Sequence, residues 1–333
     1  MSTSVVWDGP TGVRVENREV PPPGPRELKI QVEASGLCGT DLHIAAGEYP
    51  FAHPRVTLGH EFTGTIVEIG PEVDRFSIGE RIVVDPNIPC RVCTYCHSSR
   101  PHLCENPEAL GVTLNGGLSE LAVFPASQAY KVPDDVPPEA AALTEPLACA
   151  LHAVDLSGIR PGEVALVLGA GPIGILTAAL LVSSGASKVV VSEPSEDRRA
   201  RAEAVRAESI EPDAVSEEMA DVVFECVGRV ETMKAALDAA RPGGTVMWVG
   251  VAPPEAEVNV KPYDFFRKEL TVRGSYTNPY AMERALALLA SGRIDWRQIV
   301  THRFRLGEFG EAWEAHRTGA GLKVSVYPER KGF

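Results

Sequence analysis

The sequence lacks the long apolar stretch that a membrane-spanning helix requires. Its longest apolar run, residues 173–182, is interrupted by Thr177 and falls far short of the ~20 residues that cross a bilayer. No apolar signal segment follows Met1-Ser2-Thr3. We therefore expect a cytoplasmic protein without a membrane partner.

Positive charge is also in short supply. The chain has 32 Lys and Arg residues against 45 Asp and Glu residues, which gives a formal net charge of −13 at pH 7. An acidic balance of this size argues against nucleic acid or anionic lipid as the main partner. We expect the partner to be a small molecule.

Apolar residues, in contrast, make up 44% of the 333 residues, which is ample for two hydrophobic cores. Single cores stop growing at about 250–300 residues, so the length favours two domains. Residues 1–147 alternate short β-type runs with turns rich in Gly, Pro and Asp, as expected for an irregular β-rich domain. These runs are Leu28–Glu33, Gly64–Ile69, Arg81–Val84 and Leu121–Phe124.

Residues 148–275 have a different pattern, in which apolar runs without alternation are separated by helical stretches such as Glu231–Ala240. This pattern predicts a doubly wound α/β domain with a parallel sheet covered on both faces. The apolar runs are Val164–Leu168, Lys188–Val191, Val222–Cys226 and Thr245–Val249. Residues 276–333, with a predicted helix at Ala281–Ser291 and a β-type run at Lys323–Tyr327, are expected to return to the first domain.

Four cysteines lie within the segment 90–104 in the spacing C-x2-C-x2-C-x7-C. They are Cys90, Cys93, Cys96 and Cys104. Four thiolates this close can surround one tetrahedral ion, and an all-sulfur set indicates structural Zn²⁺. Two disulfides are the alternative, but they are typical of small secreted domains rather than of a long intracellular chain.

A glycine-rich turn follows the first predicted parallel strand directly and opens a helix. It reads Gly169-Ala170-Gly171-Pro172-Ile173-Gly174. The first glycine permits the tight turn, the second lets the backbone approach a pyrophosphate, and the third lets the helix pack on the strand. The helix N-terminus adds free N–H groups and a positive dipole end for the phosphates.

Glu193 closes the second predicted strand, about where a carboxylate meets the ribose hydroxyls of a bound dinucleotide. This position favours NAD over NADP. Arg198 lies close by in the sequence, so a cofactor with a 2′-phosphate remains an alternative.

Cys38 and His60 supply a thiol and an imidazole outside the four-cysteine loop, and a catalytic zinc needs about three protein ligands with one position open. Glu145 is the natural third ligand. Each residue has another interpretation: Cys38 as a buried thiol, His60 as a core histidine, and Glu145 as an acid favoured at a helix start. Thr144 is predicted to be the N-cap of that helix.

These segments together resemble the zinc-containing medium-chain alcohol and polyol dehydrogenases, in particular the branch with sorbitol, butanediol and threonine dehydrogenases. The resemblance runs through GLCGTDLH (36–43), GHE (59–61), the four-cysteine loop, TEP (144–146), GAGPIG (169–174) and FECVG (224–228). It implies a GroES-like catalytic domain, 1–147 and 276–333, with an inserted Rossmann domain, 148–275. It further implies two zinc ions per chain and hydride transfer between a secondary alcohol (a polyol, vicinal diol or cyclitol) and NAD.

The same resemblance assigns roles around the catalytic zinc. Cys38 and His60 are similar to its ligands, and Glu145 takes the third position or acts through a water. Glu61 resembles a neighbouring carboxylate that can approach the metal.

Further residues near the predicted zinc resemble helper groups. Asp41 is similar to the acid that orients the ligating histidine, which is chemically sensible because such a partner fixes the tautomer. Thr40 and His43 resemble the relay that carries the alcohol proton to solvent. Relatives also assemble through the edge of the Rossmann sheet, so a homodimer or homotetramer is expected.

The chain departs from this family between Glu193 and Asp221, which are separated by fewer residues than relatives have. We expect a helix at Asp197–Glu208, a short strand at Ser209–Ile210 and little of the next helix, with weakened NAD affinity as a consequence. Two alternative functions stay open: a zinc-independent quinone or enoyl reductase on the same scaffold, and a non-enzymatic zinc-binding module.

Overall fold

The computed structural model describes residues 1–9 and 12–328. It divides into two compact units, each taken by itself below. The first contains Met1–Glu145, Met282–Ser291 and Val300–Phe333, and the second contains Pro146–Ala281 and Gly292–Ile299. Residues 329–333, which the sequence places at the end of the catalytic domain, lie outside the described residues.

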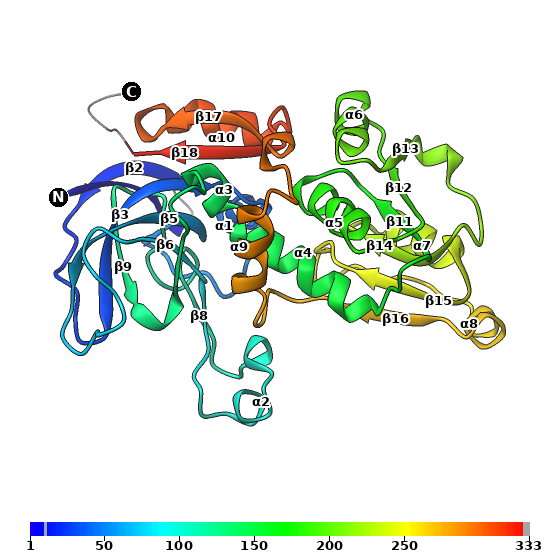
Figure 1. Ribbon diagram of the computed structural model, residues 1–333, viewed down its shortest axis with the longest axis horizontal. Helices are drawn as coiled ribbons and strands as arrows, with labels where there is room; N and C mark the ends of the chain where they lie inside the picture. The colour runs from blue at the N-terminus through cyan, green and yellow to red at the C-terminus, as the bar shows by residue number, and fades with distance from the viewer. Residues whose placement is uncertain (10–11, 329–333) are drawn as a thin grey trace. The chain divides into compact units, whose positions relative to one another are not determined.

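The first unit is built from β-sheets (Figure 1). A three-stranded sheet has the order β2-β1-β4, and a seven-stranded sheet has the order β10-β6-β5-β3-β18-β17 with β9 also pairing to β3. The strands are β1 (Ser2–Trp7), β2 (Val13–Arg18), β3 (Glu27–Gly36), β4 (Val56–Thr57), β5 (Glu61–Ile69), β6 (Arg81–Val84), β7 (Asn87–Ile88), β8 (Glu108–Ala109), β9 (Leu121–Pro125), β10 (Ala129–Lys131), β17 (Val300–Arg305) and β18 (Lys323–Tyr327).

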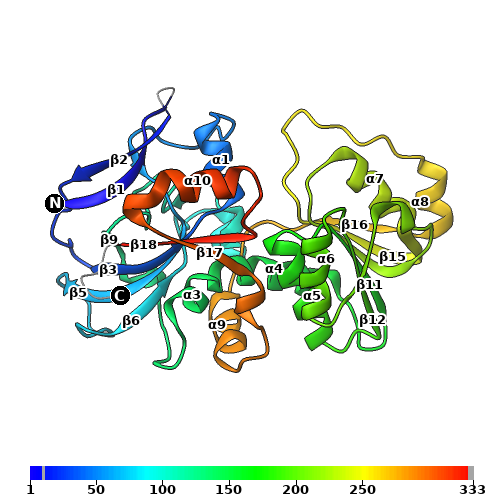
Figure 2. The same cartoon turned by 90° about the horizontal axis from the view of Figure 1, so that it is seen from above.

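Short helices complete the first unit. They are α1 (Gly39–Ala45), α2 (Thr94–His97), α3 (Pro138–Ala142), α9 (Met282–Ala290) and α10 (Phe309–Arg317). Helix α10 packs on β17 and β18 (Figure 2). One core lies between the faces of β3, β5 and β9, where Leu28, Phe62 and Phe124 are fully buried because these strands alternate apolar and polar residues.

The second unit is a six-stranded parallel sheet in the order β13-β12-β11-β14-β15-β16. Helices α5 and α6 cover one face, and α7 and α8 cover the other (Figure 2). The strands are β11 (Val164–Leu168), β12 (Lys188–Ser192), β13 (Glu208–Ile210), β14 (Ala220–Glu225), β15 (Ala240–Trp248) and β16 (Thr271–Gly274). The helices are α5 (Pro172–Ser183), α6 (Glu196–Ala204), α7 (Val230–Ala239) and α8 (Pro262–Lys268). Helix α4 (Thr144–Ser157) begins at the boundary between the units.

This strand order places β11 and β14 side by side at the point where the chain reverses direction across the sheet. In open α/β sheets, ligands bind beyond the carboxyl ends of the strands at this switch point. The glycine-rich turn follows β11 there. The predicted α/β fold class, a β-rich part with a doubly wound parallel sheet, is confirmed.

Two local predictions are wrong. The helix expected at 197–208 ends at Ala204, because Arg206 takes a left-handed conformation with φ +68° and the amide of Ala207 bonds back to the carbonyl of Ala202. Thr144 is not an N-cap: α4 already includes it, and its buried Oγ1 has no hydrogen-bond partner among the described residues. A single 3₁₀ turn, Pro212–Ala214, stands between β13 and β14.

Within residues 1–9 and 12–328, no helix has the length and apolar character needed to cross a membrane.

Candidate zinc sites and cofactor site

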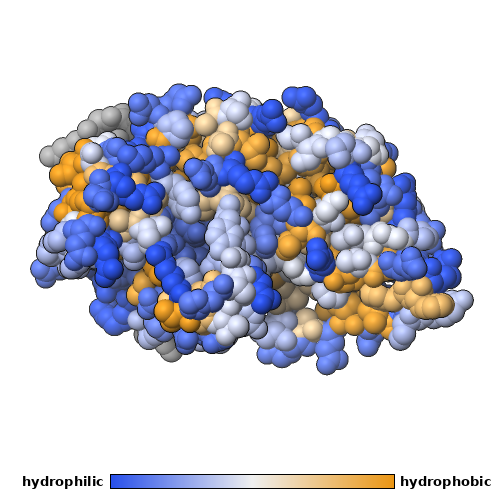
Figure 3. All heavy atoms as spheres, turned by 60° about the horizontal axis from the view of Figure 1, so that its bottom comes forward, coloured by the Kyte–Doolittle hydropathy of each residue, from blue (hydrophilic) through white to orange (hydrophobic). Residues whose placement is uncertain are grey.

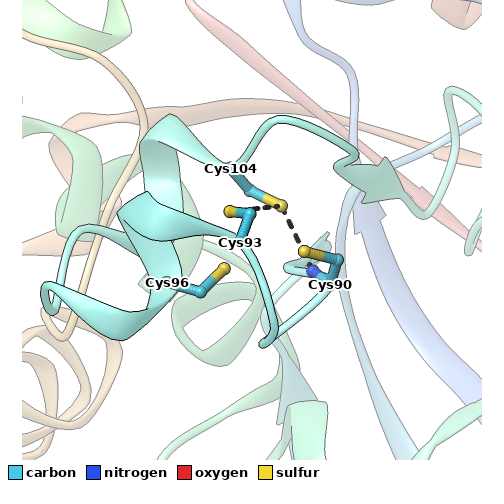
Figure 4. A group of neighbouring side chains, drawn as sticks. All are labelled: Cys90, Cys93, Cys96 and Cys104. Atoms are coloured by element: carbon cyan, nitrogen blue, oxygen red, sulfur yellow. Dashed lines mark hydrogen bonds between the residues drawn. The ribbon is translucent and has the colours of Figure 1, made fainter.

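The four-cysteine loop forms a closed sulfur cage (Figure 4). The loop is held at its base by the pairing of β7 with β8 and contains α2. All four Sγ atoms lie within 4.8 Å of one another, and those of Cys93 and Cys104 are 4.0 Å apart. Tetrahedral Zn–S bonds of about 2.3 Å place sulfurs ~3.8 Å apart, whereas a disulfide needs ~2.05 Å. The cage therefore fits Zn²⁺ and not two disulfides.

Backbone amides around the cage favour thiolates. The amide N–H groups of Cys90 and Asn106 donate to Cys104 Sγ at 3.2 and 3.4 Å. The amide of Glu105 lowers the pKa of Cys93 to about 6, while burial raises the pKa of Cys96 to about 12. Metal binding requires the deprotonated form of every thiol, so a bound ion has to displace a proton from Cys96.

A second group of metal-ligating atoms comes from distant parts of the first unit. Cys38 is the N-cap of α1, while His60 and Glu61 lie at the start of β5. One ligand atom from each lies within 4.8 Å of the others. A thiolate, an imidazole and a carboxylate oxygen form a donor set that suits Zn²⁺. These residues therefore fit the ion.

Asp41 lies beside His60. One of its oxygens accepts a hydrogen bond from the amide of Cys38 at 2.9 Å, and the other is 3.8 Å from His60 Nδ1. That distance is longer than a hydrogen bond, and neither of these two atoms has another partner in the described part of the chain. Burial opposes the charged ring, but Cys38, Asp41 and Glu145 together hold the pKa of His60 well above its ordinary value.

Glu61 has a partner that the sequence did not reveal. Lys323 Nζ donates to both of its carboxylate oxygens at 2.7 and 2.6 Å, and to the carbonyl of Leu37 at 3.0 Å. The pair is almost completely buried. Burial opposes the charge of Lys323, but the negative charges of Glu61 and Cys38 raise the pKa of the amine. No motif marks Lys323, which lies 262 positions after its partner.

Glu145 lies in the first turn of α4 and is buried, but it is not among the three residues that converge. Its charge nevertheless acts on both His60 and Lys323. His316, on α10, also belongs to these surroundings, because Asp41, Glu61 and Lys323 all act on its ring. Burial lowers the pKa of His316. Sequence reasoning found no role for this histidine.

Thr40 and His43 are both on α1, three residues apart and therefore on the same face of the helix. Cys38 Sγ is 3.7 Å from Thr40 Oγ1. His43 is exposed and its Nδ1 lies 2.7 Å from an oxygen of Glu48. The proposed relay residues thus extend from the half-buried Cys38 toward solvent.

The glycine-rich turn in the second unit has the conformation that its sequence predicts. Gly169 has φ +95°, and Gly171 precedes α5, which begins at Pro172 and continues through Ile173. A Cβ on Gly174 would lie 1.9 Å from the carbonyl oxygen of Gly169, whereas a Cβ on Gly171 would meet no atom within 4 Å. Gly174 is therefore needed for packing, and Gly171 keeps open space beside the helix N-terminus.

Glu193 ties the end of β12 to this turn. Its carboxylate accepts the amide N–H of Ala170 at 2.8 Å and that of Ser195 at 3.1 Å. The guanidinium of Arg199 donates to the carbonyls of Glu193 and Pro194 and so is already engaged. Arg198 is half-buried. The acidic side chain predicted for the ribose thus lies next to the predicted pyrophosphate turn.

Two family models match the chain: "Alcohol dehydrogenase GroES-like domain" over residues 24–134 and "Zinc-binding dehydrogenase" over 172–291. L-threonine 3-dehydrogenase of Thermococcus kodakarensis is 37% identical over 96% of this chain and 95% of its own length. The chain belongs to the zinc-containing medium-chain alcohol and polyol dehydrogenases. Sorbitol dehydrogenase of Halalkalibacterium halodurans is 33% identical to this dehydrogenase. The match covers 94% of this chain and 95% of the sorbitol dehydrogenase.

Solved structures agree with this assignment. A putative zinc-binding dehydrogenase from Sinorhizobium meliloti, bound to NADP, matches this dehydrogenase with a TM-score of 0.95 and 39% identity over 98% of this chain and 99% of that one. The 2R,3R-butanediol dehydrogenase from Bacillus subtilis matches with a TM-score of 0.91 and 30% identity, and the match covers 99% of this chain and 100% of that one. The protein is accordingly a zinc-dependent alcohol oxidoreductase that uses NAD(P) and a small-molecule alcohol.

Proposed function

We propose that this dehydrogenase oxidises secondary alcohols that carry a neighbouring hydroxyl or amino group, such as polyols, vicinal diols, cyclitols and amino alcohols. The convergence of Cys38, His60 and Glu61 in the first unit carries this proposal. The relatives named for threonine, sorbitol and 2R,3R-butanediol support it, because each of these compounds has a secondary hydroxyl beside another polar group.

In the proposed mechanism, Cys38 and His60 hold the catalytic ion, with Glu145 as third ligand or acting through a water. The ion, when bound, supplies a Lewis acid that favours loss of the substrate hydroxyl proton. Lys323 holds Glu61 in a buried ion pair, which fixes its carboxylate beside the ligand atoms of Cys38 and His60.

Proton transfer is assigned to residues of α1. The hydroxyl of Thr40 receives the substrate proton, and His43 passes it to solvent because its ring is exposed and an imidazole can both accept and release a proton. The amide of Cys38 holds the carboxylate of Asp41 at the N-terminus of α1, 3.8 Å from the ring of His60, so Asp41 acts on that ligand through its negative charge.

Cofactor binding is assigned to the second unit, with NAD favoured over NADP. Gly171 and the N-terminus of α5 accept the pyrophosphate. The carboxylate of Glu193 disfavours a 2′-phosphate by charge repulsion, and Arg199 is committed to backbone carbonyls. The relative bound to NADP makes a direct comparison of the two cofactors necessary.

We also propose that the protein is a cytoplasmic homodimer or homotetramer. Strand β16 ends the parallel sheet and leaves one edge without a strand partner in the described residues. Apolar surface gathers over the end of the second unit that carries α8 (Figure 3). The exposed apolar residues on α8 and directly before it include Val260, Tyr263 and Phe266. The seven free cysteines support a reducing compartment.

The decisive experiment combines metal analysis with a substrate screen. Protein grown with ample zinc is expected to bind two zinc ions per chain and to reduce NAD⁺ with at least one diol, sugar alcohol, cyclitol or amino alcohol. Cys38→Ala and His60→Ala should each lose one zinc and all turnover, while Cys226→Ser, which changes a thiol outside both clusters, should keep both ions. Near-normal turnover by zinc-free Cys38→Ala would reject the mechanism.

A further inference from the structure

The C-terminal end of α1 has a specific capping geometry. Gly47 takes a left-handed conformation with φ +74°, and its amide donates to the carbonyl of Ile44 at 2.9 Å. The amide of Glu48 donates to the carbonyl of His43, also at 2.9 Å. These two bonds define the Schellman motif, in which a left-handed residue reverses the chain after the last helical turn.

The Schellman motif brings the first and the last residue of this capping turn side by side. These two residues are frequently apolar and in contact with each other. Here these positions hold His43 and Glu48, and their side chains meet at 2.7 Å between Nδ1 and Oε2. The backbone fold of the cap therefore dictates the pairing. An ordinary surface ion pair must order two long side chains by itself and contributes little, but this pair starts from backbones that are already fixed.

The pairing determines which ring nitrogen of His43 is available. A carboxylate can only accept, so the bond to Glu48 requires the proton to be on Nδ1. In the neutral ring, Nε2 is then the acceptor. Thr40, three residues earlier on the same face of α1, is the group from which His43 receives a proton in the proposed function.

We propose that Glu48 is a positioning residue for the proton relay. It holds the ring of His43 in one orientation and in the Nδ1–H tautomer, so that Nε2 remains free to take the proton from Thr40. This inference rests on the proposed role of His43, and it adds a residue that acts only through that histidine. Gly47 contributes indirectly, because its left-handed conformation forms the capping turn that brings Glu48 next to His43.

Steady-state kinetics with a double-mutant cycle test the proposal. Glu48→Ala should lower kcat about tenfold with little change in KM, which is the lower end of the loss seen when the carboxylate partner of a metal-bound histidine is removed. Glu48→Gln, which keeps an uncharged acceptor, should restore most of that loss. In a His43→Ala background, Glu48→Ala should cause no further decrease, because the two residues act as one unit.

A matched control is available in the second unit. Lys188 and Glu208 form an ion pair at 2.8 Å whose side chains are 48% and 53% exposed, against 2.7 Å with 49% and 61% for His43 and Glu48. Glu208→Ala should leave kcat unchanged. An equal decrease for Glu208→Ala and Glu48→Ala, or the same loss from Glu48→Ala with and without His43, overturns the proposal.

Nitrogen-15 NMR of histidine-labelled protein gives a readout independent of turnover. The His43 signal, assigned by its loss in His43→Ala, should show the Nδ1–H tautomer in the wild type and shift toward Nε2–H in Glu48→Ala. Finding Nε2–H in the wild type rejects the inference. If His43→Ala keeps full kcat, the relay in the proposed function fails, whereas slow His43→Ala with fast Glu48→Ala rejects only the role of Glu48.

Discussion

Lys323 shows how strongly one side chain can depend on a partner far away in the sequence. Its amine is buried on β18 and has Glu61 as its charged partner, so neither charge can be removed without leaving the other buried and without its counter-charge. Such pairs add little net stability, but breaking one by a single substitution is costly. The pair therefore constrains both residues together.

Lys323→Met is expected to lower the free energy of unfolding by about 3 kcal/mol, because it leaves the carboxylate of Glu61 buried without its counter-charge. The double variant Glu61→Gln with Lys323→Met should recover much of this loss in urea denaturation. Lys29→Met provides the control: Lys29 pairs with Glu68 at 2.6 Å, but Glu68 is 45% exposed. That change should cost less than about 1 kcal/mol, and equal losses would contradict the argument.

Tyr327 offers a test at high pH. Burial, with a contribution from Glu139, raises the pKa of its hydroxyl to about 12 from an ordinary value of 10.0. Above pH 10 the unfolded chain loses this proton first, so stability is present below pH 10 and is lost as pH rises toward 12. This loss amounts to about 2 kcal/mol.

Tyr327→Phe removes the titrating group. Between pH 9 and 12 the free energy of unfolding of the wild type should therefore fall by about 2 kcal/mol relative to that of the variant. Urea denaturation across this range measures it. Tyr280→Phe, at a side chain that is 69% exposed, should show no such trend. A constant difference for Tyr327→Phe would mean that its hydroxyl titrates alike in both states.

Sequence chemistry could nominate Cys38 and His60 because thiols and imidazoles are rare and are good zinc ligands. It could not find Lys323 or His316, since an ordinary lysine in a β-type run and a helix histidine carry no local signal. Their importance comes only from the pairing of β18 with β3, at Ser325 and Gly36, and from the packing of α10 on β18. Contacts between distant segments are set by the fold and leave no spacing to recognise.

Among the secondary-structure elements, the turn between β11 and α5 separates two effects of glycine. Gly171→Ala should fold normally, since a Cβ there meets no atom within 4 Å, but the methyl group would occupy the space proposed for the pyrophosphate. NAD(H) affinity should fall at least about tenfold, or 1.4 kcal/mol. Gly174→Ala should instead destabilise the fold by about 1–3 kcal/mol, because its Cβ collides with the carbonyl of Gly169.

Thermal unfolding and cofactor titration by fluorescence measure these two effects separately. If Gly171→Ala binds NAD(H) like the wild type, the pyrophosphate does not lie at this turn. If Gly174→Ala keeps the wild-type melting temperature, the backbone of the turn is more adaptable than its close approach to Gly169 implies.

The strands of the second unit could be predicted well because each is buried on both faces and therefore reads as an uninterrupted apolar run. Val164–Leu168 has the bounds observed for β11. The end of α6 could not be predicted, because Arg206 adopts a left-handed conformation that normally signals glycine. Helix propensity could not reveal the left-handed conformation of Arg206, which accompanies the hydrogen bond from the amide of Ala207 to the carbonyl of Ala202.

The assembly of the entire protein can be tested through the apolar surface near α8. If this surface belongs to the proposed subunit interface, Phe266→Glu should shift the mass measured by light scattering toward the monomer, because it places a charge in an apolar contact. Phe51→Glu is the control: this side chain is 70% exposed in the first unit, against 80% for Phe266. A mass that changes equally in both variants, or in neither, would argue against the interface.

The architecture as a whole was predictable from the order of its segments. The glycine-rich turn after an apolar strand indicated the Rossmann sheet, and irregular β-type runs with a metal-binding loop indicated the other part. The family resemblance rested on several motifs in a fixed order, and it correctly identified the enzyme class. The individual substrate is a property of side chains that no such motif contains.

The position of β18 has a consequence for biosynthesis. On the ribosome, Cys38, His60 and Glu61 emerge early, whereas Lys323 is translated only after the complete second unit. During that interval the nascent chain carries the carboxylate of Glu61 without its ammonium partner. A chain that ends before β18 would therefore carry every proposed zinc ligand but would lack the ammonium group that neutralises Glu61 beside them.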